Sequence, residues 1–177
     1  VIIFNSAPDY ETKTSYSVIV SASDGTTTIN QTITVDIGNV NEVPQISALN
    51  TTQTPDENQT DVVTVNASDP DASTTLTYSL SGTDSSLFSI SSSGVLTFNS
   101  QPDYETPNDA DGDNNYQINV IVSDGSLSVT QAITIQVQNV ADLISGVALD
   151  GYVAGATVFQ DLNNDGAIGI DTSNLTL

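Results

Sequence analysis

The sequence contains no cysteine, methionine, tryptophan or histidine, and its 177 residues include a single basic side chain, Lys13. Without cysteine there are no disulfides, so an extracellular fold would need another kind of cross-link to stabilise it. Without histidine and cysteine, the usual groups for proton transfer and nucleophilic attack near neutral pH are missing. Glycoside hydrolysis by carboxylates alone would require an aromatic-lined cleft, and the chain has only six Tyr and four Phe. We therefore expect that the protein is not an enzyme.

Charge of one sign dominates the composition, with 22 acidic residues and a formal net charge of −21. Binding to nucleic acid is not expected, because neutralising a phosphate backbone requires Lys and Arg. An anionic membrane surface is disfavoured for the same reason, and no apolar run approaches the roughly 20 residues that span a bilayer. The chain starts at Val1 without a signal peptide, and we expect a mature or excised piece of a longer polypeptide.

Alternation of apolar and polar side chains is the main structural signal. It is clearest in residues 116–125 and 129–140, and a period of two is typical of half-buried strands. Asp124 and Gly125 between these segments are typical of a tight connection. The alternating apolar residues are Tyr116, Ile118, Val120 and Val122 in the first segment and Val129, Ile133, Ile135 and Val137 in the second. Shorter strands are predicted in residues 62–67 and 76–80, and another hairpin is predicted in residues 88–98 around Gly94. No ten-residue stretch has helical periodicity. The fold class predicted is all-β, an antiparallel β-sandwich.

The chain repeats itself with a period of about 100 residues. Residues 1–12 match 95–106 with an offset of 94, and 16–25 match 116–125 with an offset of 100. The difference between the two offsets is a six-residue insertion between Thr106 and Tyr116. We expect the chain to be a segment of an array of tandem repeats.

This repeat predicts three domains. Residues 1–43 are the C-terminal half of a module, 44–142 are a complete module, and 143–177 begin a further β-sandwich module. Because the first module is incomplete, its apolar side chains are expected to be exposed, together with an open sheet edge. We expect either that a longer polypeptide supplies the missing strands or that another subunit does.

Acidic motifs recur in a fixed order along the repeat. Glu57 beside Asn58 comes first, followed by Asp69 and Asp71 in "ASDPDA". "PDYE" occurs twice, an Asp follows a strand at both 24 and 124, and "NVNEVP" links the copies. Over residues 1 to about 142 this order resembles the cadherin-like modules of large bacterial surface proteins and adhesins. The resemblance implies tandem Greek-key sandwiches of cadherin or Ig-like type.

The resemblance also implies Ca²⁺ ions bound between successive modules. Ca²⁺ takes six to eight oxygen ligands in tolerant geometry, so carboxylates from two modules and their linker can share ions. Carried over by position, the ligands at the junction of the two copies are Asp9, Glu11, Asn39, Asn41, Glu42, Asp69, Asp71 and Asp124. Asn41 stands where the family has Asp, and Glu42 where it has Asn, so we expect fewer or weaker ions there.

Three further groups are candidate calcium ligands. Asp103 and Glu105 belong to the site that the second module offers to its follower, and Glu57 stands where the family has a Glu beside an Asn near the start of a module. The insertion supplies Asp109, Asp111 and Asp113 around Gly112, and "DLNNDG" supplies Asp161, Asn163 and Asp165. Neither loop has the distal Glu of an EF-hand. Any single Asp is equally well explained as a turn residue, but random acids would not recur in register at 9/103, 11/105 and 24/124.

The sequence therefore predicts a calcium-binding, calcium-rigidified structural or adhesive segment of an extracellular bacterial surface protein. Its expected partners are calcium ions and neighbouring modules of the same chain or of identical subunits. Two alternatives stay open. One is a subunit of an extracellular filament assembled by strand complementation, and the other is a non-catalytic spacer of a secreted enzyme.

Overall fold

The computed structural model describes residues 1–141. The strands in this part are β1 (Ser15–Ser23), β2 (Thr28–Asp36), β3 (Gln45–Ser47), β4 (Thr52–Gln53), β5 (Asp61–Thr64), β6 (Asn66–Ser68), β7 (Thr77–Ser81), β8 (Phe88–Ile90), β9 (Val95–Phe98), β10 (Asn115–Ser123) and β11 (Ser128–Gln136), with one 3-10 turn, η1 (Ser85–Leu87). The predicted all-β class is confirmed. Within residues 1–141 no helix is long and apolar enough to cross a membrane. The predicted third domain and its ligands Asp161, Asn163 and Asp165 lie outside the described residues.

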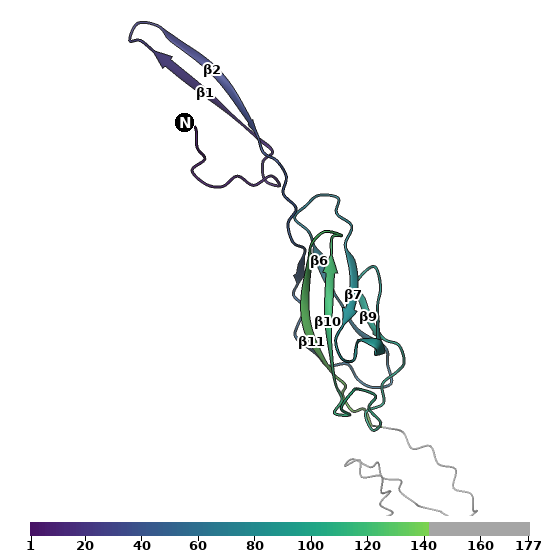
Figure 1. The fold of residues 1–177 in the computed structure, drawn as a ribbon. Helices are drawn as coiled ribbons and strands as arrows, with labels where there is room; N and C mark the ends of the chain where they lie inside the picture. Colours follow the sequence, from purple (N-terminus) through teal and green to yellow (C-terminus); the bar gives the residue numbers. More distant parts are fainter. Residues whose placement is uncertain (142–177) are drawn as a thin grey trace, which may run out of the picture.

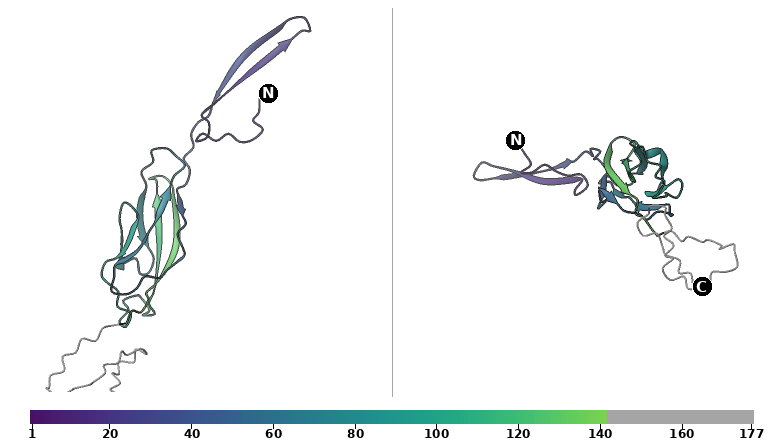
Figure 2. Two further views of the ribbon diagram at one scale, coloured as in Figure 1. Left: turned by 180° about the vertical axis from the view of Figure 1, so that it is seen from behind. Right: turned by 90° about the horizontal axis from the view of Figure 1, so that it is seen from below.

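The described chain is elongated. Figure 1 shows the β1–β2 hairpin at one end, joined by a single linker to a sandwich that holds all the other strands. The views from behind and from below in Figure 2 show the same separation. The described residues thus form a hairpin and a sandwich, and the linker between them runs through residues 37–44.

The sandwich is built from a four-stranded sheet facing shorter sheets. The first sheet has the order β4-β11-β10-β7, and the others are β3-β6 and β5-β9-β8. Strands β5 and β6 are separated only by Val65, whose N–H donates to the Gly94 carbonyl at 2.8 Å. The two short sheets thus form one layer. All strand pairs are antiparallel except β4 with β11, which are parallel.

The core lies between the two layers, where the alternation of β10 and β11 predicts it. Tyr116, Ile118, Val120 and Val122 are at most 2% exposed, and Ile133, Ile135 and Val137 are also buried. Val129 packs at the edge of this core. The ring centroids of Phe88 and Phe98 lie 4.4 Å apart, and Tyr116 meets both rings edge to face. Burial of each such side chain stabilises the fold by about 1.5–3 kcal/mol.

The hairpin repeats the β10–β11 pair, as the offset of 100 predicts. Ser15 pairs with Asp36 in β1–β2, and Asn115 pairs with Gln136 in β10–β11, with both registers continuing unbroken to the turn. The turns agree as well. The Asp24 and Asp124 carboxylates each accept hydrogen bonds from the N–H groups two and three residues later.

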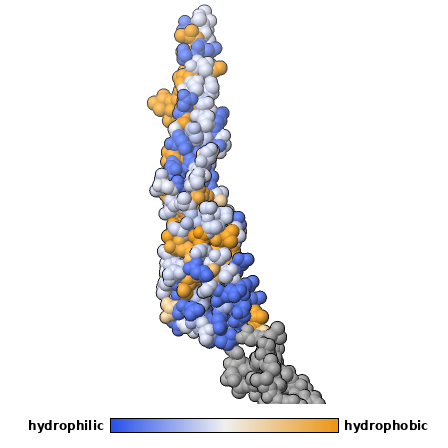
Figure 3. All heavy atoms as spheres, turned by 90° about the vertical axis from the view of Figure 1, so that its right-hand side faces the viewer, coloured by the Kyte–Doolittle hydropathy of each residue, from blue (hydrophilic) through white to orange (hydrophobic). Residues whose placement is uncertain are grey.

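What differs between the copies is burial. Val18, Val20 and Ile29 of the hairpin are 37%, 41% and 72% exposed, because no second layer covers them. Apolar side chains reach the surface of the hairpin in Figure 3. The two PDYE tyrosines differ in the same way. Tyr104 packs against the sandwich core, whereas Tyr10 is 37% exposed because the hairpin has no second layer to cover it.

Candidate metal centre

Carboxylates gather at three places in the described part of the chain. At each place three side chains supply one oxygen apiece, and these oxygens lie within 4.8 Å of one another. The three sets are Glu11, Glu42 and Asp71; Glu57, Asp103 and Glu105; and Asp109, Asp111 and Asp113. We call them the junction, lower-end and insertion clusters. Oxygens at such separations are compatible with one Ca²⁺, whose bonds to oxygen are about 2.3–2.6 Å long.

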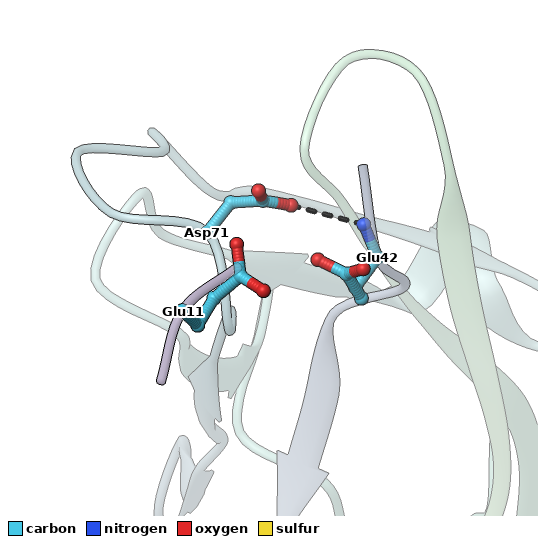
Figure 4. A group of neighbouring side chains, drawn as sticks. All are labelled: Glu11, Glu42 and Asp71. Atoms are coloured by element: carbon cyan, nitrogen blue, oxygen red, sulfur yellow. Dashed lines mark hydrogen bonds between the residues drawn. The ribbon is translucent and has the colours of Figure 1, made fainter. Parts of the chain in front are cut away.

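The junction cluster brings together three segments that are distant in sequence. Glu11 comes from the turn before β1, Glu42 from the linker and Asp71 from the loop between β6 and β7, and all three carboxylates face one another in Figure 4. The Glu42 N–H donates to Asp71 Oδ2 at 2.9 Å, and Asn39 Nδ2 donates to Asp71 Oδ1 at 2.7 Å. The linker is thereby hydrogen-bonded to the top of the sandwich.

Two buried oxygens at this junction have no hydrogen-bond partner. They are Glu42 Oε2 and Asp69 Oδ2. The other oxygen of Asp69 accepts from the Asp71 N–H at 2.8 Å, which fixes the side chain in its loop. A buried, unpaired carboxylate oxygen is costly without a cation. The junction residues therefore fit a bound Ca²⁺ better than they fit an ion-free fold.

A second linker contact reaches the β10–β11 turn. Asn41 Nδ2 donates to Asp124 Oδ2 at 2.8 Å, while Asp124 Oδ1 accepts from Ser126 N and Leu127 N within the turn. Asp124 thus lies at the junction, as predicted. Asp9 is engaged differently. Its carboxylate accepts from Glu11 N, Thr12 N and Thr12 Oγ1, so both of its oxygens support the turn that presents Glu11.

The electrostatics of the junction reflect crowded negative charge. Partial burial raises the pKa of the Glu42 carboxyl, and the charges of Glu11 and Asp71 raise it further. Hydrogen bonds from Asn39 and the Glu42 N–H lower the pKa of Asp71. The single basic side chain does not neutralise these carboxylates, because Lys13 Nζ lies over the Tyr16 ring, 4.5 Å from its centroid. Neutralisation must therefore come from outside the chain.

The lower-end cluster is organised around Glu57, which is only 4% exposed. Glu57 Oε2 accepts from the Tyr104 N–H at 2.9 Å and Oε1 from the Val140 N–H at 2.8 Å. Asp103 supports its own turn through the N–H groups of the second and third residues that follow it, as Asp9 does. Asn139 Nδ2 donates to Glu105 Oε1 at 2.6 Å. We did not predict Asn139 as a site residue, although the offset of 100 from Asn39 was a signal for it.

The insertion cluster forms a compact loop before β10. Burial alone would raise the pKa of Asp109, but hydrogen bonds from the Asp113 N–H and from Asp111 hold it below its ordinary value. The pKa of Asp111 is raised, first by its hydrogen bond with Asp109 and then by the nearby charge of Asp113. The structure thus brings together the three aspartates that the sequence singled out in this loop.

Comparison with known proteins identifies a family and a fold. The cadherin domain matches residues 50–138, which are 89 of the 177 residues. No curated protein matches the chain significantly.

Among solved structures, mouse cadherin-23 EC22-24 is 24% identical with a TM-score of 0.60, covering 76% of this chain and 45% of that one. Human protocadherin-24 EC1-2 is 23% identical with a TM-score of 0.56 (76% and 70% covered), and Drosophila N-cadherin EC1-4 is 20% identical with a TM-score of 0.56 (74% and 34% covered). At these identities the likeness shows the fold alone. The chain spans less than half the length of the mouse structure.

Cadherin domains are extracellular and non-catalytic and bind Ca²⁺ between repeats, in keeping with the acidic clusters at both ends of this sandwich. On its domain match and its fold, the chain belongs to the cadherin family.

Proposed function

We propose that the chain is a calcium-rigidified structural segment in which Ca²⁺ joins the hairpin module, residues 1–43, to the sandwich module, residues 44–142. The observation that carries the proposal is the pair of buried oxygens without partners, Glu42 Oε2 and Asp69 Oδ2, beside Glu11 and Asp71. The residues that would hold the ion are Glu11, Glu42, Asp69, Asp71 and Asp124. The two linker amides, Asn39 and Asn41, already orient two of these carboxylates.

Calcium would supply positive charge to which both modules bind at once. Carboxylates a few ångströms apart repel one another, and this repulsion favours separation of the turn bearing Glu11 from the loop bearing Asp71. A shared cation reverses the sign of that interaction. The linker hydrogen bonds of Asn39 and Asn41 then act together with the metal, and rotation between the modules is restricted.

The wider role follows from the arrangement of the clusters. A module with carboxylates at both ends can be repeated along a line, and the lower-end cluster would bind a following module in the same way. We infer a rigid spacer or adhesive stalk on the outside of a cell. The order of the acidic motifs supports assignment to a surface protein of the bacterial type.

Calorimetric titration with Ca²⁺ tests the junction site. A junction variant, Glu42→Gln with Asp69→Asn, removes two charges but keeps Asp71 and its hydrogen bonds to the linker. We expect it to lose at least one ion relative to the unaltered chain. The matched control, Asp36→Asn with Asp61→Asn, removes two exposed charges outside the three clusters and should bind as the unaltered chain does. Equal stoichiometry and affinity in all three proteins would refute the proposal.

The hairpin supports a second candidate, a subunit completed by strands from another chain. Val18, Val20 and Ile29 occupy the positions of Ile118, Val120 and Val129, of which the first two are at most 2% exposed in the sandwich. In the hairpin all three side chains are at least 37% exposed, and its two-stranded sheet has two open edges. Open edges and apolar faces favour pairing with further strands.

Light scattering on residues 1–177 tests this second candidate. We expect a mass above that of one chain, and a shift to the single-chain mass in the variant Val18→Thr with Ile29→Thr. Threonine keeps the β-branched shape that strands favour, so the hairpin should persist. Ile19→Thr is the control, because Ile19 is 64% exposed on the opposite face. A monomer in every case would exclude strand complementation between copies.

A further inference from the structure

The insertion before β10 is held in place by hydrogen bonds to the body of the sandwich. The Asn108 N–H donates to the Tyr116 hydroxyl at 3.3 Å, and the Ala110 N–H donates to Asp84 Oδ1 at 3.0 Å. Asp84 is itself 5% exposed, and its other oxygen accepts from the Gln117 N–H at 2.6 Å. The loop is therefore an ordered part of the second module. The hairpin copy has no counterpart, because it lacks the six-residue insertion.

Asp109 is buried in this loop with one oxygen unsatisfied. The residue is 8% exposed, its Oδ2 accepts from the Asp113 N–H at 2.9 Å, and its Oδ1 has no hydrogen-bond partner. The buried Oδ1 of Asn114 also lacks a partner. A buried carboxylate is stable only when it is paired or binds a metal. The sole basic side chain, Lys13, lies against Tyr16 in the other module.

Two further carboxylates converge on Asp109. One oxygen each from Asp109, Asp111 and Asp113 lies within 4.8 Å of the others, about twice the length of a bond from Ca²⁺ to oxygen. The loop turns at Gly112, whose φ of +74° is accessible to glycine at little cost. Three acids with no neighbouring base form a site for a hard divalent cation.

We propose that the insertion binds a Ca²⁺ ion of its own, through Asp109, Asp111 and Asp113, inside a single module and independently of the junction. All three carboxylates come from one loop, so the site requires neither the linker nor a following module. This distinguishes it from an ion shared between modules.

The site also has a consequence for the lower-end cluster. Asn114 Nδ2 donates to the Tyr104 carbonyl at 2.8 Å, and the Tyr104 N–H donates to Glu57 Oε2 at 2.9 Å. Ordering the loop therefore holds the segment that bears Asp103 and Glu105. Calcium in the insertion prearranges the carboxylates that face the next module.

Calcium titration followed by nuclear magnetic resonance tests the insertion site. We expect the Gly112 amide signal to shift with a dissociation constant of about 10⁻⁴–10⁻³ M, the range of extracellular modules. In a loop variant, Asp109→Asn with Asp111→Asn, that shift should be lost and the calorimetric stoichiometry should fall by one ion. Asparagine keeps an acceptor for the Asp113 N–H, and unchanged signals from Tyr116 and Val120 would report an intact core.

The junction variant and the charge control separate this proposal from the previous one. Both should retain the Gly112 shift, because neither alters the loop. If the junction variant loses ions but keeps this shift, the two sites are independent, as proposed. If Gly112 does not respond to millimolar Ca²⁺ in the unaltered chain, or if the loop variant binds as many ions as the unaltered chain, the insertion is not a calcium site. Mg²⁺ shifting Gly112 at equal or lower concentration would also overturn the assignment to Ca²⁺.

Discussion

Chelation of calcium is expected to lower the melting temperature of the sandwich by about 10 °C or more. An ion that binds the folded state alone stabilises it by about 2.7 kcal/mol at a hundredfold excess over its dissociation constant. For a domain of about 100 residues, each kcal/mol shifts the midpoint by about 4–8 °C. The effect is large because buried oxygens at Glu42, Asp69 and Asp109 have no internal partner to stabilise them when the ion is removed.

Differential scanning calorimetry in Ca²⁺ and in chelator measures this shift. The loop variant and the junction variant should each show a smaller response than the unaltered chain, since each retains only part of the calcium sites. The charge control at Asp36 and Asp61 should respond in full. Superimposable melting curves with and without Ca²⁺ would contradict the stabilising role of the metal.

The sandwich could be predicted from sequence where a simple period governs the chain. Tyr116, Ile118, Val120 and Val122 alternate with mainly polar residues, and the structure buries all four because a strand at a half-buried sheet presents every second side chain to the core. The offset between the copies predicted equal pairing in β1–β2 and β10–β11 for the same reason. Long strands with strong alternation leave little choice of register.

The short strands could not be predicted in this way. Strands β3 and β4 have three and two residues, which are too few to reveal any period. The break between β5 and β6 depends on one residue, Val65, whose N–H bonds to the tight Gly94 turn of another hairpin. Such pairings are set by tertiary contacts, and local sequence does not record them.

For the candidate site, the sequence identified carboxylates but not their surroundings. Asp109 and Asp111 look alike in "DADGD", yet Asp109 is buried and Asp111 is exposed, because Asp84 and Tyr116 draw one side of the loop inward. Asp84 belongs to no recognisable sequence motif, and only the fold shows that it positions this loop. The roles of Asn39 and Asn41 as donors to Asp71 and Asp124 likewise required the structure.

Loss of the junction carboxylates is expected to uncouple the two modules without unfolding either one. Glu42→Gln with Asp69→Asn removes the charges that would bind the metal, while the hydrogen bonds of Asn39 and Asn41 stay available. Both hydrogen bonds join the linker, and not the hairpin itself, to the sandwich, so on their own they should not fix the orientation of the hairpin. The sandwich core contains neither residue and should keep its native signals.

Residual dipolar couplings measure this coupling most directly, because β1–β2 and β10–β11 share one register and provide matched N–H vectors in the two modules. The measurement uses the Val18→Thr, Ile29→Thr background, which is expected to be monomeric. With Ca²⁺ the two hairpins should fit a single alignment tensor. With chelator, or in the junction variant, the β1–β2 couplings should shrink while those of β10–β11 persist. A single tensor in chelator as well as in Ca²⁺ would contradict the account, since direct packing would then hold the modules together without metal.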